Sequence, residues 1–285
     1  MFVVGGSSSR SLSTEVARIL GAPHAQAATS RFPDGECYTR VDAPLGGEDA
    51  VIIQNTYPDG NLVEMLLIQD AVKRAGPRSV TLVVPYFGYA RQDRVFKPGE
   101  PESAGAMAAH LGMACDRIVT VDIHKEEVLG RFGCPGRDLK AAAAIADHFR
   151  GGGVDLVLAP DIGAAGRARD VGDRLGVPHD HLEKTRLSGS EVRIAPAKMD
   201  CAGKRILIVD DMISTGGTII AARGALAAAG AESVSAACTH GVFAPGALER
   251  LQGSLDGIAC CDTIEGAAST ISAAPLIAAA LREEW

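Results

Sequence analysis

The sequence has no long apolar run. No apolar stretch approaches the roughly 18 residues that a helix needs to cross a bilayer. The chain starts MFVVGG and moves at once into polar serines, whereas an export signal has a charged segment followed by a longer apolar one. We therefore expect a soluble, cytoplasmic protein that does not engage a membrane.

Positive charge is also scarce. The chain has 28 Lys and Arg against 35 Asp and Glu, a net charge of −7. General nucleic-acid binding requires a broad basic face. The composition therefore argues against a nucleic-acid partner, and any anionic ligand must be held by a few local basic groups.

Paired cysteines are absent as a motif. The seven cysteines form no CxxC pair and no metal-ligand spacing. Their odd number and the single Trp suit a reduced cytoplasmic protein. We expect most of these cysteines to be small core residues.

The sequence does contain a repeating α/β pattern. Its 285 residues allow two domains, each with its own core. Short β-rich runs alternate with helical stretches, and the runs are Val51–Ile53, Val80–Val84, Ile118–Val121, Val154–Leu158, Ile206–Val209 and Val234–Cys238. Such alternation predicts mainly parallel sheets, in which ligands gather at the carboxyl ends of the strands.

A glycine-rich stretch suggests where the domains divide. RGGGVD, residues 150–155, follows a helix-like segment and precedes a new strand. We therefore predict domains at residues 1–149 and 150–285, with the C-terminal tail packing back on the first. Each half has a strand ending in an acid, IVTVDIH and ILIVDDM, which hints at duplication of one fold.

The most informative stretch is RILIVDDMISTGGTII, residues 205–220. Its continuous apolar run predicts a buried strand that ends before Asp210 and Asp211. A turn then leads into a helix, and its glycines and hydroxyls are Ser214, Thr215, Gly216, Gly217 and Thr218. Such a turn suits a phosphate, but the acids would repel phosphate unless a cation or sugar hydroxyls lie between. A phosphorylated sugar meets both demands and is favoured over simple helix capping.

Two segments supply clustered cations. VVPYFGYARQDRVFKPGEP, residues 83–101, places Arg91, Arg94 and Lys97 after a buried strand, which suits a polyphosphate. A solvated loop with paired charges is the alternative. In HLEKTRLSGSEVRI, an extended backbone would put Lys184 and Arg186 on one side. Two cations suit a transferring phosphoryl group, because that chemistry depends on positioning and charge stabilisation.

Two further groups of candidate site residues are weaker evidence when each is taken alone. In RFPDGECYTRV, Phe32 is suited to stacking on a base, and Asp34 and Glu36 to accepting hydrogen bonds from an exocyclic amine, although a polar turn is equally consistent. His124 and Asp161 each follow a predicted strand. A lone histidine is more often structural, but the two could share a Mg²⁺ bound to phosphates.

Taken together, these segments resemble a known family. VDDMISTGGTI resembles the phosphoribosyl-diphosphate signature of type I phosphoribosyltransferase folds. With RFPDGE, PYFGYARQD, DIH, APD, CTHGVF and DTI, in order from about residue 31 to 264, it resembles the ribose-phosphate diphosphokinases, in detail their archaeal-type branch. The resemblance implies two tandem phosphoribosyltransferase-like domains, ATP on the first and ribose 5-phosphate on the second. The implied products are AMP and phosphoribosyl diphosphate.

The resemblance also implies residue roles. ATP would be bound by Phe32, Asp34 and Glu36 of a neighbouring subunit and by Arg91, Gln92 and Asp93, which implies a homo-oligomer, at least a dimer. His124 and Asp161 would bind Mg²⁺, and Lys184 and Arg186 would be the catalytic pair. Ribose 5-phosphate would be bound by Asp210, Asp211, Ser214, Thr215, Gly216, Gly217 and Thr218. Ser214 departs from the bacterial and animal members, which usually carry a third acid there.

Two alternatives stay open. A catalytically silent regulatory homologue should have lost catalytic cations or acids, yet Lys184, Arg186, Asp210 and Asp211 are all present. A phosphoribosyltransferase that joins a base to the sugar would leave RFPDGE and YARQD without a task.

Overall fold

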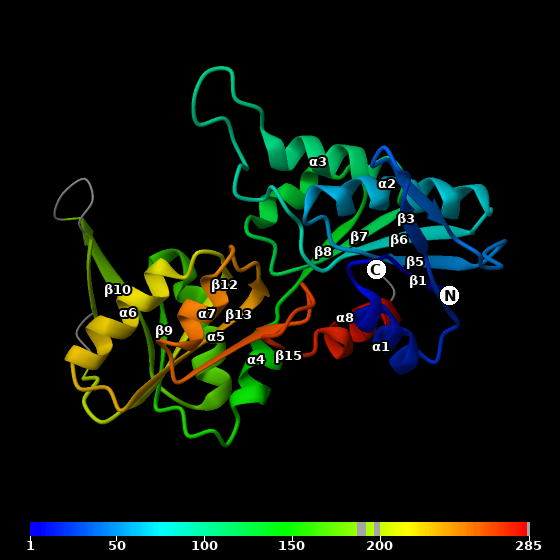
Figure 1. Ribbon diagram of the computed structural model, residues 1–285. Coiled ribbons are helices and arrows are strands. Elements are labelled where there is room, and N and C mark those ends of the chain that lie inside the picture. Colours follow the sequence, from blue (N-terminus) through cyan, green and yellow to red (C-terminus); the bar gives the residue numbers. More distant parts are fainter. Residues whose placement is uncertain (187–191, 197–199, 284–285) are drawn as a thin grey trace. The chain divides into compact units, whose positions relative to one another are not determined.

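The chain folds into two compact α/β units (Figure 1). The computed structural model describes residues 1–186, 192–196 and 200–283, and only the backbone of residues 184–186 and 192–196. Unit 1 comprises residues 1–140, 263–265 and the segment from 272 onward, and unit 2 comprises residues 141–262 and 266–271. The predicted pair of α/β folds is confirmed.

Unit 1 is built on a parallel sheet. In sheet order its strands are β2 (His24–Gln26), β1 (Phe2–Gly5), β5 (Asp49–Ile53), β6 (Ser79–Val84), β7 (Arg117–Val121) and β8 (Gly136–Leu139). The helices are α1 (Arg10–Leu20), α2 (Asp59–Arg74), α3 (Ser103–Gly112), α8 (Ala274–Arg282) and the short 3₁₀ helix η1 (Glu126–Arg131). A separate antiparallel hairpin pairs β3 (Ala28–Arg31) with β4 (Cys37–Arg40).

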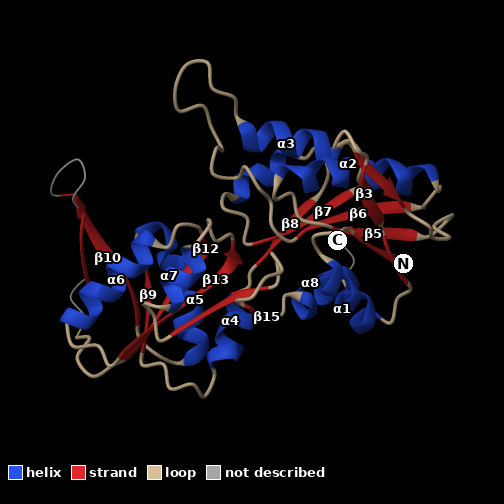
Figure 2. Ribbon diagram, viewed as in Figure 1, coloured by secondary structure: helices blue, strands red, loops and turns tan. Residues whose placement is uncertain are grey.

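The order of these strands explains the layers. The chain crosses from β1 to β2 in one direction through α1, and from β5 to β6 and β7 in the other through α2 and α3. Right-handed crossovers in opposite directions place their helices on opposite faces of the sheet. Figure 1 shows α2 and α3 on one face and α1 with α8 on the other. Figure 2 shows that the connection from β6 to α3, residues 85–102, has no regular structure.

Unit 2 repeats this plan. In sheet order its strands are β11 (Val192–Pro196), β10 (His179–Arg186), β9 (Leu156–Ala159), β12 (Arg205–Ile213), β13 (Ser233–Gly241), β14 (Gly257–Cys261) and β15 (Ser269–Ile271). Its helices are α4 (Ala142–Phe149), α5 (Ala165–Leu175), α6 (Gly217–Ala228), α7 (Ala247–Gln252) and the 3₁₀ turn η2 (Ile162–Ala164). Among the described residues, neighbouring strands of this sheet pair in parallel, except β10 and β11, which are antiparallel.

Each unit has its own apolar core. Val4, Ile52 and Leu82 are completely buried in unit 1, and Leu158 and Ile208 in unit 2. Burying such a side chain contributes about 1.5–3 kcal/mol. Central strands covered on both faces therefore read as continuous apolar runs, as the sequence predicts.

The unit boundary differs from the sequence-based division at 149 and 150. The glycines 151–153 form a turn between α4 and β9, inside unit 2. Residues 142–149 belong to unit 2 because α4 packs on α5. The C-terminal helix α8 packs on α1 in unit 1. Within the described residues, no helix has both the length and the apolar character to cross a bilayer.

Candidate active site

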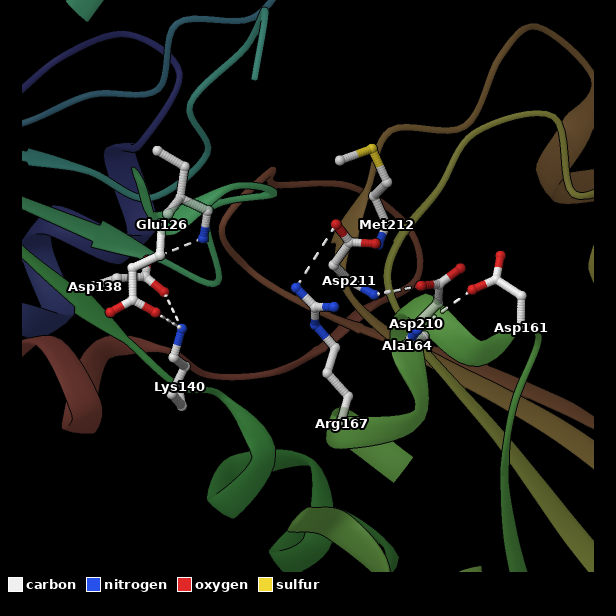
Figure 3. Close-up of polar contacts among 10 residues, drawn as sticks. Glu126, Asp138, Lys140, Asp161, Ala164, Arg167, Asp210, Asp211 and Met212 are labelled. Atoms are coloured by element: carbon white, nitrogen blue, oxygen red, sulfur yellow. Dashed lines mark hydrogen bonds and ion pairs between the residues drawn. The ribbon is translucent and has the colours of Figure 1, made fainter. Parts of the chain in front are cut away.

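The acid pair lies within β12. This strand continues past the apolar run to Ile213, because Met212 and Ile213 still pair with β13. The expectation that the strand ends before the acids is therefore wrong. The backbone N–H of Asp211 donates to Asp210 Oδ1 at 2.9 Å, and that of Met212 donates to Asp211 Oδ1 at 2.9 Å. Each carboxylate is thus fixed to the backbone one residue ahead (Figure 3).

Burial makes this pair electrostatically unusual. It raises the pKa of Asp210 to about 8, and the neighbouring Asp211 carboxylate adds to the shift. Arg167 of α5 lies on the opposing side, with its Nη2 3.8 Å from Asp211 Oδ2 (Figure 3). That distance is too long for a hydrogen bond. The pair therefore favours a ligand that supplies hydroxyl donors or a cation.

Sequence reasoning missed Arg167. It lies in AAGRARD, where Arg169 follows two residues later. Positions two apart in a helix face different directions, so only one of these two arginines can face the acids. Nothing in the sequence selects which one. Arg167 contacts Asp211, whereas Arg169 is an exposed neighbour of Asp170.

The turn after β12 has the predicted form. Gly216 has φ +74° and is the N-cap of α6, whose first residue is Gly217. Ala244 N donates to Ser214 O at 3.1 Å, and Arg250 Nη2 donates to Thr215 O at 3.3 Å. The glycines and hydroxyls predicted to bind a phosphate therefore lie at a helix N-terminus, which favours an anion.

Gly216→Ala tests how far this turn depends on its left-handed residue. A Cβ at Gly216 would lie 2.8 Å from Leu251 Cδ1, inside the core, and the positive φ itself costs about 1–2 kcal/mol with a side chain. We expect a fall in Tm of about 3 °C or more. Gly217→Ala is the matched control, since the nearest atom to its Cβ would be 3.9 Å away. Equal effects of the two changes on Tm would contradict this reading.

Asp161 lies on the same edge of the unit 2 sheet. It follows β9, which pairs with β12 in parallel. Its Oδ1 accepts a hydrogen bond from Gly163 N at 2.9 Å. It also accepts one from Ala164 N at 3.3 Å (Figure 3). The connections from β9 and β12 leave in opposite directions, so this edge is the switch point where α/β sheets bind ligands.

The acids of this edge fit a hard cation. Across the described residues, no three His, Cys, Asp or Glu side chains gather closely enough to hold a metal by themselves. Mg²⁺ is normally held by one or two carboxylates together with water and substrate phosphates. Asp161, Asp210 and Asp211 therefore suit Mg²⁺ that arrives with phosphates, rather than a closed metal cage.

His124 belongs to unit 1. It is exposed in the turn that follows β7, directly after the buried Asp122 and Ile123. Its predicted partnership with Asp161 joins residues of different units and stays a prediction. Sequence reasoning missed two neighbours of this turn, Asp138 and Lys140, whose side chains are 2.6 Å apart. Burial raises the pKa of Asp138 against the opposing effect of its donors.

The predicted nucleotide segments also lie in unit 1. Phe32, Asp34 and Glu36 are exposed in the turn between β3 and β4, where Phe32 N donates to Glu36 O at 2.9 Å. Phe32 packs edge-on against Tyr38 with ring centroids 5.8 Å apart. One face of an aromatic ring is thus presented at the tip of the hairpin.

The YARQD loop is anchored at the same end of α2 as this hairpin. Tyr89 Oη donates to Asp59 Oδ1 at 2.7 Å. The guanidinium of Arg31, in the hairpin, lies so close to Gly60 that a Cβ added there would be 2.6 Å from Arg31 Nη2. The loop is also joined to α3, because Oγ of Ser103, the first residue of that helix, donates to Gln92 Oε1 at 2.7 Å.

The charged residues of this loop, Arg91, Asp93 and Arg94, lie in different surroundings. Arg91 is exposed, and Asp93 lines a cavity of about 390 Å³ with Glu102, Lys125 and Arg131. Arg94 stacks over Phe96, 5.1 Å from the ring centroid.

The predicted catalytic pair falls in β10. The backbone is extended, as the sequence argument required, and Lys184 pairs with Ile194 and Arg186 with Val192 of β11. The side chains of Lys184 and Arg186 lie outside the described part of the chain, so their role stays a prediction.

Comparisons with known proteins agree with this arrangement. Residues 1–114 match the model of the N-terminal domain of ribose phosphate pyrophosphokinase, and residues 136–264 match the phosphoribosyl transferase domain. Ribose-phosphate pyrophosphokinase from Methanosarcina acetivorans is 41% identical over 99% of both chains. The one from Pyrococcus abyssi is 42% identical over 95% of both.

A solved structure resembles the whole chain. The crystal structure of phosphoribosylpyrophosphate synthetase from Mycobacterium smegmatis covers 99% of this chain and 97% of its own, with a TM-score of 0.85 and 31% identity. The family models, the curated relatives and this structure agree along nearly the full length. The chain therefore belongs to the ribose-phosphate pyrophosphokinase family.

Proposed function

We propose that this protein transfers the diphosphoryl group of ATP to O1 of ribose 5-phosphate, giving AMP and phosphoribosyl diphosphate. The observation that carries the proposal is the direct connection of Asp210 and Asp211 to a phosphate-type turn at the N-terminus of α6. The acids accept from the ribose hydroxyls, and Ser214 to Thr218 hold the 5-phosphate. Full-length similarity to ribose-phosphate pyrophosphokinases supports the same reaction.

The reaction makes one bond and breaks one. The O1 oxygen bonds to the β-phosphorus of ATP as the bond from that phosphorus to the α,β-bridging oxygen breaks. AMP leaves, and the hydroxyl proton is released to water. Lys184 and Arg186 stabilise the negative charge of the transferring group, which is the main demand of phosphoryl transfer.

ATP is the proposed ligand of unit 1. Arg91, Gln92 and Asp93 bind the nucleotide, and the exposed ring of Phe32 stacks on adenine while Asp34 and Glu36 accept from its amino group. His124 and Asp161 would hold Mg²⁺ together with ATP phosphates, and Asp210 and Asp211 a second Mg²⁺. Bound Mg²⁺ would neutralise phosphate charge and orient the phosphates.

One assay tests the reaction. The protein is incubated with Mg-ATP and ribose 5-phosphate, and AMP and phosphoribosyl diphosphate are identified. AMP at background level would overturn the proposal. Thermal protection separates it from the phosphoribosyltransferase alternative, because a bound ligand raises Tm. Protection by ATP supports the diphosphokinase, whereas protection by a free base and not by ATP supports the transferase.

A second copy of this chain is the proposed partner. Val63, Leu66 and Leu67 are spaced along one face of α2 and remain 48, 39 and 38% exposed. The hairpin, which packs beside α2 through β4, adds the exposed Phe32 and Tyr38. We call these five residues the α2–hairpin face. An apolar face of this kind suits a homo-oligomer in which Phe32 reaches the adenine of the neighbouring subunit.

Leu66→Glu tests this partner. A charge in the centre of the α2–hairpin face should shift the protein from a dimer or larger oligomer to a monomer, because burying an unpaired carboxylate is costly. Sedimentation velocity measures the change, and the KM for ATP should rise with it. The matched control is Met113→Glu, since Met113 is 72% exposed outside this face. A wild-type monomer, or an unchanged oligomer in Leu66→Glu, would contradict the proposal.

A further inference from the structure

The turn that carries His124 is attached to the neighbouring strand. β7 and β8 run in parallel, with Thr120 opposite Asp138 and Val121 opposite Leu139. Beyond them, Asp122 N donates to Leu139 O at 2.8 Å, and Ile123 N donates to Asp138 Oδ1 at 2.9 Å. The second of these bonds uses a side chain, so the course of the turn depends on which residue occupies position 138.

Asp138 is a buried acid whose two carboxylate oxygens both accept hydrogen bonds. Its side chain is completely buried. Oδ1 accepts from Thr120 Oγ1 at 2.7 Å and from Ile123 N, and Oδ2 accepts from Lys140 Nζ at 2.6 Å. A buried carboxylate is tolerated only where hydrogen bonds and an opposite charge compensate it. This carboxylate therefore joins β7, the turn and Lys140.

Lys140 extends the same connection past His124. Its Nζ also donates to Glu126 Oε2 at 2.9 Å, and Glu126 is the first residue of η1 (Figure 3). His124 lies between Ile123 and Glu126 in the chain. The residues on both sides of it are thus bound to the segment 138–140.

The backbone gives a reason for so much support. Asp122 has φ +41°, in the left-handed region that a residue with a side chain seldom adopts. Such a conformation persists only where the surroundings enforce it, and it is concentrated at functional sites. Asp122 itself donates its N–H to Leu139 O, and the next residue, Ile123, donates its N–H to Asp138 Oδ1. These are the two residues before His124.

We infer that Asp138 and Lys140 are positioning residues for His124. They hold the chain on either side of it and so direct its imidazole toward the Mg-nucleotide. This inference rests on the proposed function, in which His124 meets the Mg²⁺ of ATP. Neither residue touches the nucleotide itself, and both act through the turn.

Nucleotide affinity is the first test. We expect Asp138→Ala to weaken binding of Mg²⁺ with a non-hydrolysable ATP analogue by about tenfold in calorimetry, and to raise the KM for Mg-ATP similarly. The KM for ribose 5-phosphate should stay within about twofold. Asp138→Asn keeps an oxygen for Ile123 and Thr120 and should restore part of the loss. Lys140→Met, which leaves the Ile123 bond in place, should cost about threefold.

A matched control lies on the same strand. Arg137 precedes Asp138 in β8 and pairs with Glu283 near the surface. Arg137→Ala should bind the Mg-nucleotide within about twofold of wild type. If Asp138→Ala fails to fold, Asp138→Asn and Lys140→Met carry the test. Wild-type affinity in both would overturn the inference.

A double-mutant cycle with His124→Ala separates positioning from general support. If Asp138 acts through His124, Asp138→Ala should add less than about twofold to the loss already caused by His124→Ala. A general structural role predicts multiplied losses, and that result would overturn the inference. Because binding is measured without turnover, an absence of AMP in the wild type would overturn the proposed reaction alone.

Discussion

Replacing Lys184 with Ala is expected to lower kcat by about 10³-fold, while the KM values for ATP and ribose 5-phosphate change less than about threefold. The physical reason is the timing of the charge. A cation that stabilises negative charge only as the diphosphoryl group is transferred contributes to the transition state and not to the bound ground state. Initial-rate kinetics with each substrate varied in turn measure the separation.

The control for Lys184 is its neighbour. Glu183 is exposed in the same strand, β10. Glu183→Ala should retain kcat within about twofold, which would show that the strand itself is intact. A KM for ribose 5-phosphate that rises as much as kcat falls would instead assign Lys184 to sugar-phosphate binding.

The position of the active-site edge follows from local chemistry. A continuous apolar run predicts the buried part of β12, and Gly216 predicts the turn because its left-handed φ suits glycine. The end of β12 was not predictable in this way. Asp210 and Asp211 interrupt the apolar pattern, yet the backbone stays extended because β13 continues beside it to Gly241. Pairing with a distant strand outweighed local composition.

The supporting residues could not be recognised from sequence for a related reason. Asp138 lies in the short polar strand GRDL, which has no apolar run to mark it. Its importance comes from contacts with Thr120 and Ile123 on the adjacent strand and turn. Such contacts depend on strand register, which the three-dimensional fold sets and no local motif encodes.

Asp210→Asn is expected to separate activity from stability. Once the bound ligand displaces the proton of Asp210, its carboxylate makes a charge-assisted hydrogen bond to a ribose hydroxyl, which is worth about 1.5–3 kcal/mol and which an amide cannot replace. We therefore expect kcat/KM for ribose 5-phosphate to fall by about 10²-fold. The ligand-free protein should become more stable, because the same change removes a carboxylate whose ionisation is opposed by burial and by Asp211.

The raised pKa of Asp210 determines how the stability of the folded protein changes with pH. The pKa of Asp210 is about 8 in the folded protein against 3.8 ordinarily, so between these values the folded state holds a proton that the unfolded chain has released. Wild-type stability should therefore fall as the pH rises from about 4 to about 8. Asp210→Asn lacks this loss. In metal-free buffer its Tm should exceed that of wild type by about 5 °C at pH 8 and match it near pH 4.

A second acid of the same unit should respond with the opposite sign. Asp155 accepts hydrogen bonds from Arg205, which lower its pKa below 3.8. Its stabilisation is complete above the ordinary pKa and is lost as the pH falls through the lowered value. Asp155→Asn should therefore reduce Tm slightly at neutral pH and have no effect in strong acid. A Tm of Asp210→Asn at or below that of wild type at pH 8 would contradict the conclusion that burial of the β12 acid pair opposes folding, and a raised Tm of Asp155→Asn would contradict the stabilising role of the Asp155–Arg205 contact.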